Sequence, residues 1–239
     1  SRSMLAPDLR PNRLERAKFS ILDFVQRHGR GRVGLVAFSG QAFLQCPLTF
    51  DYNAFRESLL AIDVKTIPVA GTDIGRALDE AFRAMEKNDR RKLMVLLTDG
   101  EDLEKSGVRT AEALAKKGII VFAVGVGTPA GSQIQFVNEQ GLPDLVRDEQ
   151  GQVVQSRLDE PTLQAVARAT RGAYHPLGHL GEGLNRIRHL IDTGAGSADS
   201  ARVRKLGVDR FHYAVAAVMV LLLVESLIGT RRKLNEAKD

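Results

Sequence analysis

The chain has 239 residues, of which 44% are hydrophobic and 26% charged, the ordinary balance of a globular protein. This length holds one α/β domain with a sizeable core and an additional segment. The net charge of +5 is spread over predicted helix faces and termini, and the chain has no Trp and only three Tyr, which argues against a nucleic-acid partner. The single cysteine, Cys46, excludes an internal disulfide and is interpreted as a buried thiol.

Helical and strand patterns alternate over the first 191 residues. In chain order they predict a helix over 13–26, a strand buried on both faces over 33–38, a more exposed strand over 41–47, helices over 52–62 and 74–86, a buried strand over 92–97, a helix over 108–116, a strand over 119–126, a β-hairpin insertion over about 133–157, a helix over 160–169, a short edge strand over 173–175 and a helix over 180–191. The alternation predicts a doubly wound, Rossmann-like α/β domain over residues 1–192 with a mostly parallel central sheet.

The composition changes after this domain. Residues 193–210 are interpreted as a linker that begins rich in Gly, Ala and Ser, residues 211–229 as a transmembrane helix, and residues 230–239 as a basic tail. Nineteen helical residues span about 28 Å, close to the thickness of the bilayer core. An amphipathic or core helix is the alternative, but the apolar run over 213–224 has no polar face. The tight cluster Arg231–Lys233 favours a cytoplasmic tail, which puts the domain on the other side of the membrane.

Four oxygen-bearing side chains are candidate ligands of a divalent cation. Asp99 directly follows the strand predicted over 92–97, Thr72 lies in a loop before a helix, and Ser1 and Ser3 begin the chain. Ligands of doubly wound sheets bind beyond the carboxyl ends of the strands, where loops from several strands meet. Carboxylate and hydroxyl oxygens suit Mg²⁺, with Mn²⁺ or Ca²⁺ as alternatives. Each element alone also fits an ordinary structural role, because Ser, Thr and Asp are common in turns and helix caps.

The four residues together resemble the metal-ion-dependent adhesion site (MIDAS) of von Willebrand factor A (VWA) domains. Ser1 and Ser3 match the two serines of the family's Asp-x-Ser-x-Ser motif, Thr72 its threonine and Asp99 its second aspartate. The first aspartate would lie two residues before Ser1, so we expect the chain to be an N-terminally truncated fragment that lacks this ligand and the strand before it. The resemblance implies that a bound ion takes its last ligand from an acidic side chain of a protein partner.

Longer segments resemble the bacterial Bat, aerotolerance-type, membrane-anchored VWA proteins. They are Ser1–Lys18, Gly34–Gly40, Pro47–Thr49, Gly71–Leu78, Leu96–Asp102 and Ser156–Leu163. The resemblance implies a protein of the bacterial inner membrane with a periplasmic VWA domain and further upstream membrane segments. It also implies association with a MoxR-type AAA+ ATPase system and with other VWA proteins, in an envelope or stress-tolerance complex.

Sequence patterns of catalysis are weak. His175 and His179 are four residues apart, but Pro176 and Gly178 disfavour a helical ligand pair, and no Gly-x-Ser-x-Gly elbow occurs. Glu101 and Asp102 are interpreted as a solvated acidic loop that attracts cations. We therefore expect a binding module and not an enzyme. The alternatives are a metal-dependent hydrolase that uses the same crevice, and a scaffold with a vestigial metal site.

Overall fold

The computed structural model describes residues 1–28, 31–69, 71–85, 92–102, 106–137, 142–147 and 150–193, and beyond them Met219 and Leu222. By internal contacts the chain divides into two units, Ser1–Ala198 and Asp199–Asp239. The predicted membrane helix over 211–229 and the tail over 230–239 lie outside the described residues, except for Met219 and Leu222, which are helical and exposed. Within the described ranges, no helix combines the length and the apolar character needed to cross a bilayer.

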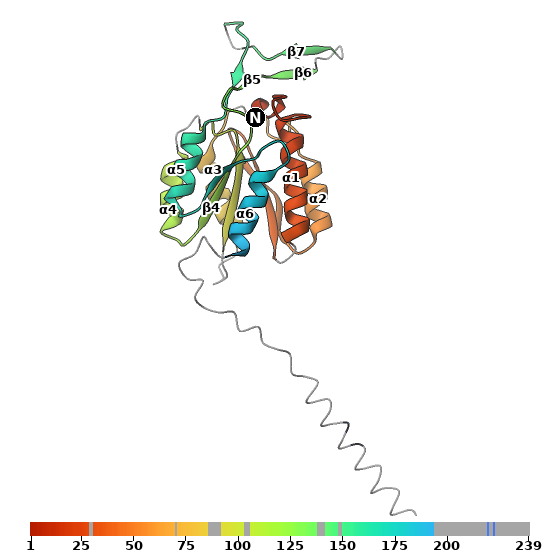
Figure 1. Cartoon of the computed structure of the whole chain (residues 1–239), viewed down its shortest axis with the longest axis vertical. Coiled ribbons are helices and arrows are strands. Elements are labelled where there is room, and N and C mark those ends of the chain that lie inside the picture. The colour runs from red at the N-terminus through yellow and green to blue at the C-terminus, as the bar shows by residue number, and fades with distance from the viewer. Residues whose placement is uncertain are drawn as a thin grey trace, which may run out of the picture. The chain divides into compact units, whose positions relative to one another are not determined.

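The first unit alternates helices and strands as the sequence predicts. The elements are a 3₁₀ helix η1 (Arg2–Leu5), α1 (Arg13–His28), β1 (Val33–Phe38), β2 (Ala42–Thr49), α2 (Tyr52–Leu60), α3 (Ile74–Ala84), β3 (Leu93–Thr98), α4 (Gly107–Ala115), β4 (Ile120–Gly125), β5 (Ser132–Gln133), β6 (Gln135–Val137), β7 (Pro143–Leu145), β8 (Gln155–Ser156), α5 (Glu160–Ala169), β9 (Tyr174–Pro176) and α6 (Glu182–Asp192). Figure 1 shows the larger strands lying between the helices, so the domain has an α/β architecture.

Two main groups of strands form the sheet layer. Strands β3, β4 and β9 are parallel and lie in the order β3-β4-β9, so β9 is an edge strand, as predicted. Strand β1 pairs antiparallel with β2. The parallel arrangement brings the carboxyl ends of β3 and β4 together, since Thr98 is paired with Gly125. This common edge is where a doubly wound sheet binds its ligands.

Strand β4 is buried on both faces because helices cover each side of it. Val121 and Ala123 pack with α3, α4 and α5, whereas Phe122 and Val124 pack with α1 and α6. Alternate side chains of a strand point to opposite faces, so these four residues divide evenly between two cores. The result is the two-sided burial expected of a strand in a parallel sheet.

Strand β1 departs from the prediction that both of its faces are covered. Ala37 is its one buried residue, Gly34 is exposed and the other positions are half-buried. Among the described strands β1 pairs with β2 alone and has no hydrogen-bonded partner on its other side. A continuous apolar run therefore overstated the burial of this strand.

An insertion stands at the carboxyl edge of the sheet. Its base is the antiparallel pair β5 and β8, its outer part is the pair β6 and β7, and an isolated bridge joins Arg147 to Val153 between them. Figure 1 shows β6 and β7 beyond the end of the domain at which the N-terminus lies.

Candidate metal centre

Asp99 sits where the chain leaves β3, in a turn held from two sides. The amide of Val126 donates to the carbonyl of Thr98 at 2.8 Å, and the amide of Asp159 donates to the carbonyl of Asp99 at 2.8 Å. Gly100 has a φ of +87°, and a Cβ added there would contact the Asp159 carbonyl oxygen. Only glycine adopts this conformation at such a close approach without strain. The Asp99 turn is therefore fixed against the start of α5.

The two serines of the predicted site lie together. The hydroxyl oxygens of Ser1 and Ser3 are 2.8 Å apart, and Ser3 is 4% exposed. Burial lowers the pKa of the Ser1 α-amino group, while the negative charge of Asp99 acts in the opposite direction. Asp99 therefore lies within electrostatic range of Ser1, although the two are 98 positions apart in the sequence.

Thr72 lies in the neighbouring loop and is 4% exposed. The loop is fixed by hydrogen bonds from the Ser39 hydroxyl to the Gly71 carbonyl at 2.7 Å and from the Asp73 amide to the Ser39 carbonyl at 2.9 Å. Among the described residues, no hydrogen bond joins Thr72 to Ser1, Ser3 or Asp99. The structure thus joins the two serines to each other and fixes the Thr72 loop, and the gathering of all four residues around one ion stays a prediction.

Asp102 ties the Thr72 loop to the Asp99 turn. Its carboxylate accepts from the amide of Ile74, at the start of α3, at 3.4 Å, and from the amide of Gly107, at the start of α4, at 2.7 Å. Asp73 adds a second link, because it accepts from the Ser106 hydroxyl at 2.9 Å. A carboxylate that caps two helix ends satisfies amides that have no partner within their own helices.

The acidic loop predicted after Asp99 is not open to solvent. Asp102 is half-buried as a double helix cap, and Glu101 is half-buried as well. Burial and then the charge of Asp99 raise the pKa of Glu101, against smaller opposing effects of Arg13 and of hydrogen bonds from Arg157 and Ser156. The sequence shows adjacent acidic residues but not the two helix ends and the insertion that enclose them.

The Asp99 carboxylate is buried, with 1% exposure, yet each of its contacts is long. One oxygen, Oδ2, lies 3.4 Å from Arg13 Nη1 and 3.4 Å from the Ser156 hydroxyl, and Oδ1 lies 3.4 Å from the Thr98 hydroxyl. Strong hydrogen bonds to a carboxylate are about 2.5–2.9 Å long. A buried carboxylate with such weak partners retains lone pairs for another ligand.

These residues fit a hard divalent cation. Three hydroxyls and one carboxylate offer oxygen ligands, and Mg²⁺ needs few carboxylates because it keeps several waters. The described residues contain no group of three or more His, Cys, Asp or Glu that could hold a metal. The chemistry of the cluster is accordingly that of a hydroxyl-rich oxygen site and not of a zinc site with nitrogen or sulfur ligands.

The sequence did not predict that a positively charged side chain, that of Arg13, is buried beside Asp99. Arg13 is fully buried at the start of α1, and its Nη1 donates to the Ser156 hydroxyl at 2.7 Å. A signal for this role was present, because Arg13 lies four residues before Ala17, on the predicted apolar stripe of the helix. A charged residue on the buried face of a helix needs a charged partner inside the fold.

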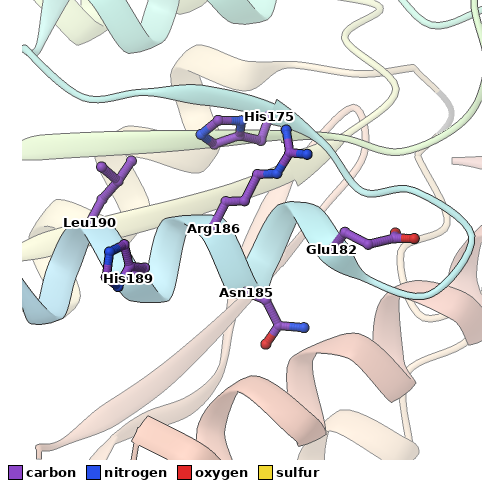
Figure 2. Close-up of a pocket in the computed structure, with 6 residues that line it drawn as sticks. All are labelled: His175, Glu182, Asn185, Arg186, His189 and Leu190. Carbon is purple, nitrogen blue, oxygen red and sulfur yellow. The ribbon is translucent and has the colours of Figure 1, made fainter.

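A separate surface hollow of about 580 Å³ lies between β9 and α6. It is lined by His175, Glu182, Asn185, Arg186, His189 and Leu190, and Figure 2 shows the Arg186 side chain extending toward His175. Burial and then the positive charge of Arg186 lower the pKa of His175. None of the four predicted ligands lines this hollow, so it is distinct from the oxygen cluster.

Comparison with known proteins gives the class of the domain. The von Willebrand factor type A domain family matches residues 1–101, which include all four predicted ligands. The proximal thread matrix protein 1 of the mussel byssus, solved with a zinc-occupied MIDAS motif, shares the fold at 20% identity, a TM-score of 0.55 and coverage of 80% of this chain and 43% of that one. The domain is thus a VWA domain.

Two solved bacterial structures narrow the assignment. BatB from Bacteroides thetaiotaomicron is 36% identical, with 82% of this chain and 95% of that chain covered and a TM-score of 0.78. An aerotolerance-related membrane protein from Bacteroides fragilis is 34% identical, with 81% and 94% covered and a TM-score of 0.75. The chain belongs to the Bat-type, aerotolerance-related family of VWA proteins.

Proposed function

We propose that this VWA domain binds protein partners through a divalent cation held at the carboxyl edge of its sheet. The observation that carries the proposal is the Asp99 carboxylate, which is 1% exposed and has three contacts of 3.4 Å. The ion pair with Arg13 is one of these long contacts, so it stabilises the buried charge only weakly unless another ligand binds it. The zinc-occupied site of the mussel VWA protein supports the assignment, because it shows that the fold can hold such an ion.

Each side chain has a role that follows from its chemistry. Asp99 provides the negative charge, either directly or through a water, and Ser1, Ser3 and Thr72 provide neutral oxygens. Mg²⁺, Mn²⁺ or Ca²⁺ supplies Lewis acidity to this set. Because one carboxylate does not neutralise a divalent ion, an acidic side chain of the partner completes the charge balance. We propose binding and no catalysis, since the arrangement requires no proton transfer or nucleophile.

The cellular setting is part of the proposal. The apolar segment over 211–229 anchors the domain in the inner membrane, and the basic residues after it keep the tail in the cytoplasm and the VWA domain in the periplasm. The Bacteroides fragilis relative is itself described as a membrane protein. The partners are a protein with an exposed acidic side chain, other VWA proteins of the family and a MoxR-type ATPase system.

Calorimetric titration of the chain with Mg²⁺ and Mn²⁺ tests the metal site. Thr72→Val and Asp99→Asn keep the side-chain shapes but remove a hydroxyl and a charge. We expect Thr72→Val to weaken binding at least about tenfold, as the loss of one ligand, and Asp99→Asn to abolish it. Asp23→Ala, which removes an exposed carboxylate paired with Arg27, is the control and should bind as the parent does. Unchanged binding in Thr72→Val and Asp99→Asn would refute the site.

A further inference from the structure

Arg13 forms the centre of a buried ionic network at the edge of the metal centre. Its Nε and Nη2 donate to the two carboxylate oxygens of Asp8, each at 2.8 Å. Its Nη1 reaches the Ser156 hydroxyl at 2.7 Å and Asp99 Oδ2 at 3.4 Å, and Nη2 reaches the Ser156 carbonyl at 3.2 Å. One guanidinium therefore lies between two carboxylates, firmly bound to Asp8 and loosely bound to Asp99.

The guanidinium is fixed in this position. Asp8 is itself held by the amide and the hydroxyl of Thr128, at 2.9 and 3.0 Å. Gly127 has a φ of +126°, and a Cβ there would lie 2.7 Å from the Arg13 guanidinium carbon, so the backbone closes over the group. An arginine that is fully buried and held by a bidentate carboxylate cannot move away when another charge arrives.

A fixed positive charge beside Asp99 opposes a second cation. Two positive charges a few ångströms apart repel strongly where water is excluded. Asp8 partly offsets this repulsion because it neutralises the guanidinium from the other side. The charge at the metal centre is thus set by the balance of Arg13 and Asp8, neither of which offers a ligand in the predicted site.

We propose that Arg13 is an affinity-setting residue: it keeps cation binding by the isolated domain weak, so that tight binding requires the acidic side chain of a partner. This inference rests on the proposed metal-dependent function. Without Arg13, Asp99 and Asp8 would together attract the ion strongly, and the site would be filled whether or not a partner were present. With Arg13 in place, the negative charge that retains the ion comes from the acidic side chain of a partner.

Because Arg13 and Asp8 carry opposite charges, their replacement should change the affinity for Mn²⁺ in opposite directions. Arg13→Gln removes the fixed positive charge and should tighten Mn²⁺ binding about tenfold or more. Asp8→Asn leaves the guanidinium without its main counter-charge and should weaken Mn²⁺ binding several-fold. Arg13→Lys keeps the charge and should bind nearly as the parent does. A purely structural role of the network predicts weaker binding in Arg13→Gln and Asp8→Asn alike.

The measurement is Mn²⁺ titration of the full chain in detergent, with free Mn²⁺ followed by electron paramagnetic resonance. Thermal unfolding of each variant shows whether it is folded. If Arg13→Gln does not fold, the double variant Asp8→Asn/Arg13→Gln replaces it, because this variant removes both buried charges. The double variant should also bind more tightly than Asp8→Asn.

The results distinguish failure of the proposed role of Arg13 from failure of the proposed metal-dependent function. Opposite shifts in Arg13→Gln and Asp8→Asn support the affinity-setting role, as does binding that emerges only when Arg13 is replaced. Parent binding with equal or parallel changes in both variants overturns the role of Arg13 but leaves the metal site intact. Absence of Mn²⁺ binding in the parent and in every variant overturns the proposed function itself.

Discussion

The neighbouring acidic residues Asp99, Glu101 and Asp102 differ in what surrounds them. Asp99 is almost fully buried with long contacts, Glu101 is half-buried with a raised pKa, and Asp102 accepts from the amides that begin two helices. The same residue type therefore serves as a candidate ligand at one position and as a helix cap three positions later. Burial and hydrogen-bond geometry, which only the fold defines, make the distinction.

His175 makes stability depend on pH. Burial and Arg186 lower its pKa in the folded state below the ordinary value of 6.5, so the unfolded chain takes up a proton more readily as the pH falls. The free energy of unfolding should therefore decrease as the pH falls through about 6.5, and this contribution should be absent in His175→Asn. Urea denaturation between about pH 7.5 and about pH 5 measures it.

Arg186→Gln provides a matched control for the electrostatic part of this effect. It removes the neighbouring positive charge but keeps His175, so the pH dependence should become shallower without disappearing. The assignment would be wrong if the pH dependence of unfolding in His175→Asn were the same as in the parent.

The four candidate ligands were chosen from the sequence because their types and order form a motif, and their role as ligands stays a prediction. Ser1, Ser3, Thr72 and Asp99 are polar residues at predicted loop or strand ends, and the structure places the hydroxyls of Ser1 and Ser3 in contact. Arg13 was not predicted, because its partners Asp8 and Ser156 come from a loop and from the insertion. A pairing that depends on the three-dimensional route of the insertion has no local pattern in the sequence.

At the scale of elements, the spacing of apolar residues predicted the helix α1 and the strand β4 well. The helix expected over 13–26 is α1, Arg13–His28, and the strand expected over 119–126 is β4, Ile120–Gly125. Strand β1 is less buried than its apolar run suggested, since it pairs with β2 outside the three-stranded sheet. Hydrophobic runs indicate which residues can be covered, but the order of strands decides which ones are.

Asp102 joins the starts of α3 and α4, so its removal should cost more than the loss of a single cap. Asp102→Ala is expected to lower the free energy of unfolding by about 2 kcal/mol, because two helix-end amides lose their acceptor. Asp51→Ala is the comparison: Asp51 also accepts from two amides, but both belong to α2 and the contact is exposed, so its loss releases no second helix and should cost less. Urea denaturation of both variants gives the two values, and an equal or smaller loss in Asp102→Ala would contradict the joining role.

At the scale of the whole molecule, the proposed membrane anchor over 211–229 predicts where the chain is found in the cell. We expect the full chain to sediment with membranes and a chain that ends at residue 198 to stay in the supernatant, because the apolar segment supplies the anchor. A reporter fused after Asp239 should be active only in the cytoplasm. A full chain recovered in the supernatant would refute the anchor, and a reporter active outside the cytoplasm would refute the orientation.

The turn that carries Asp99 also bears on ion size. Its carbonyl is bound by the Asp159 amide, and Gly100 lies so close to α5 that no side chain fits between them. If Asp99 bound the proposed ion directly, its braced backbone would oppose a lengthening of the bond from the roughly 2.1 Å of Mg²⁺ to the roughly 2.4 Å of Ca²⁺. Discrimination between these two ions would then originate in the docking of α5 against the turn, in a part of the domain that holds none of the ligands.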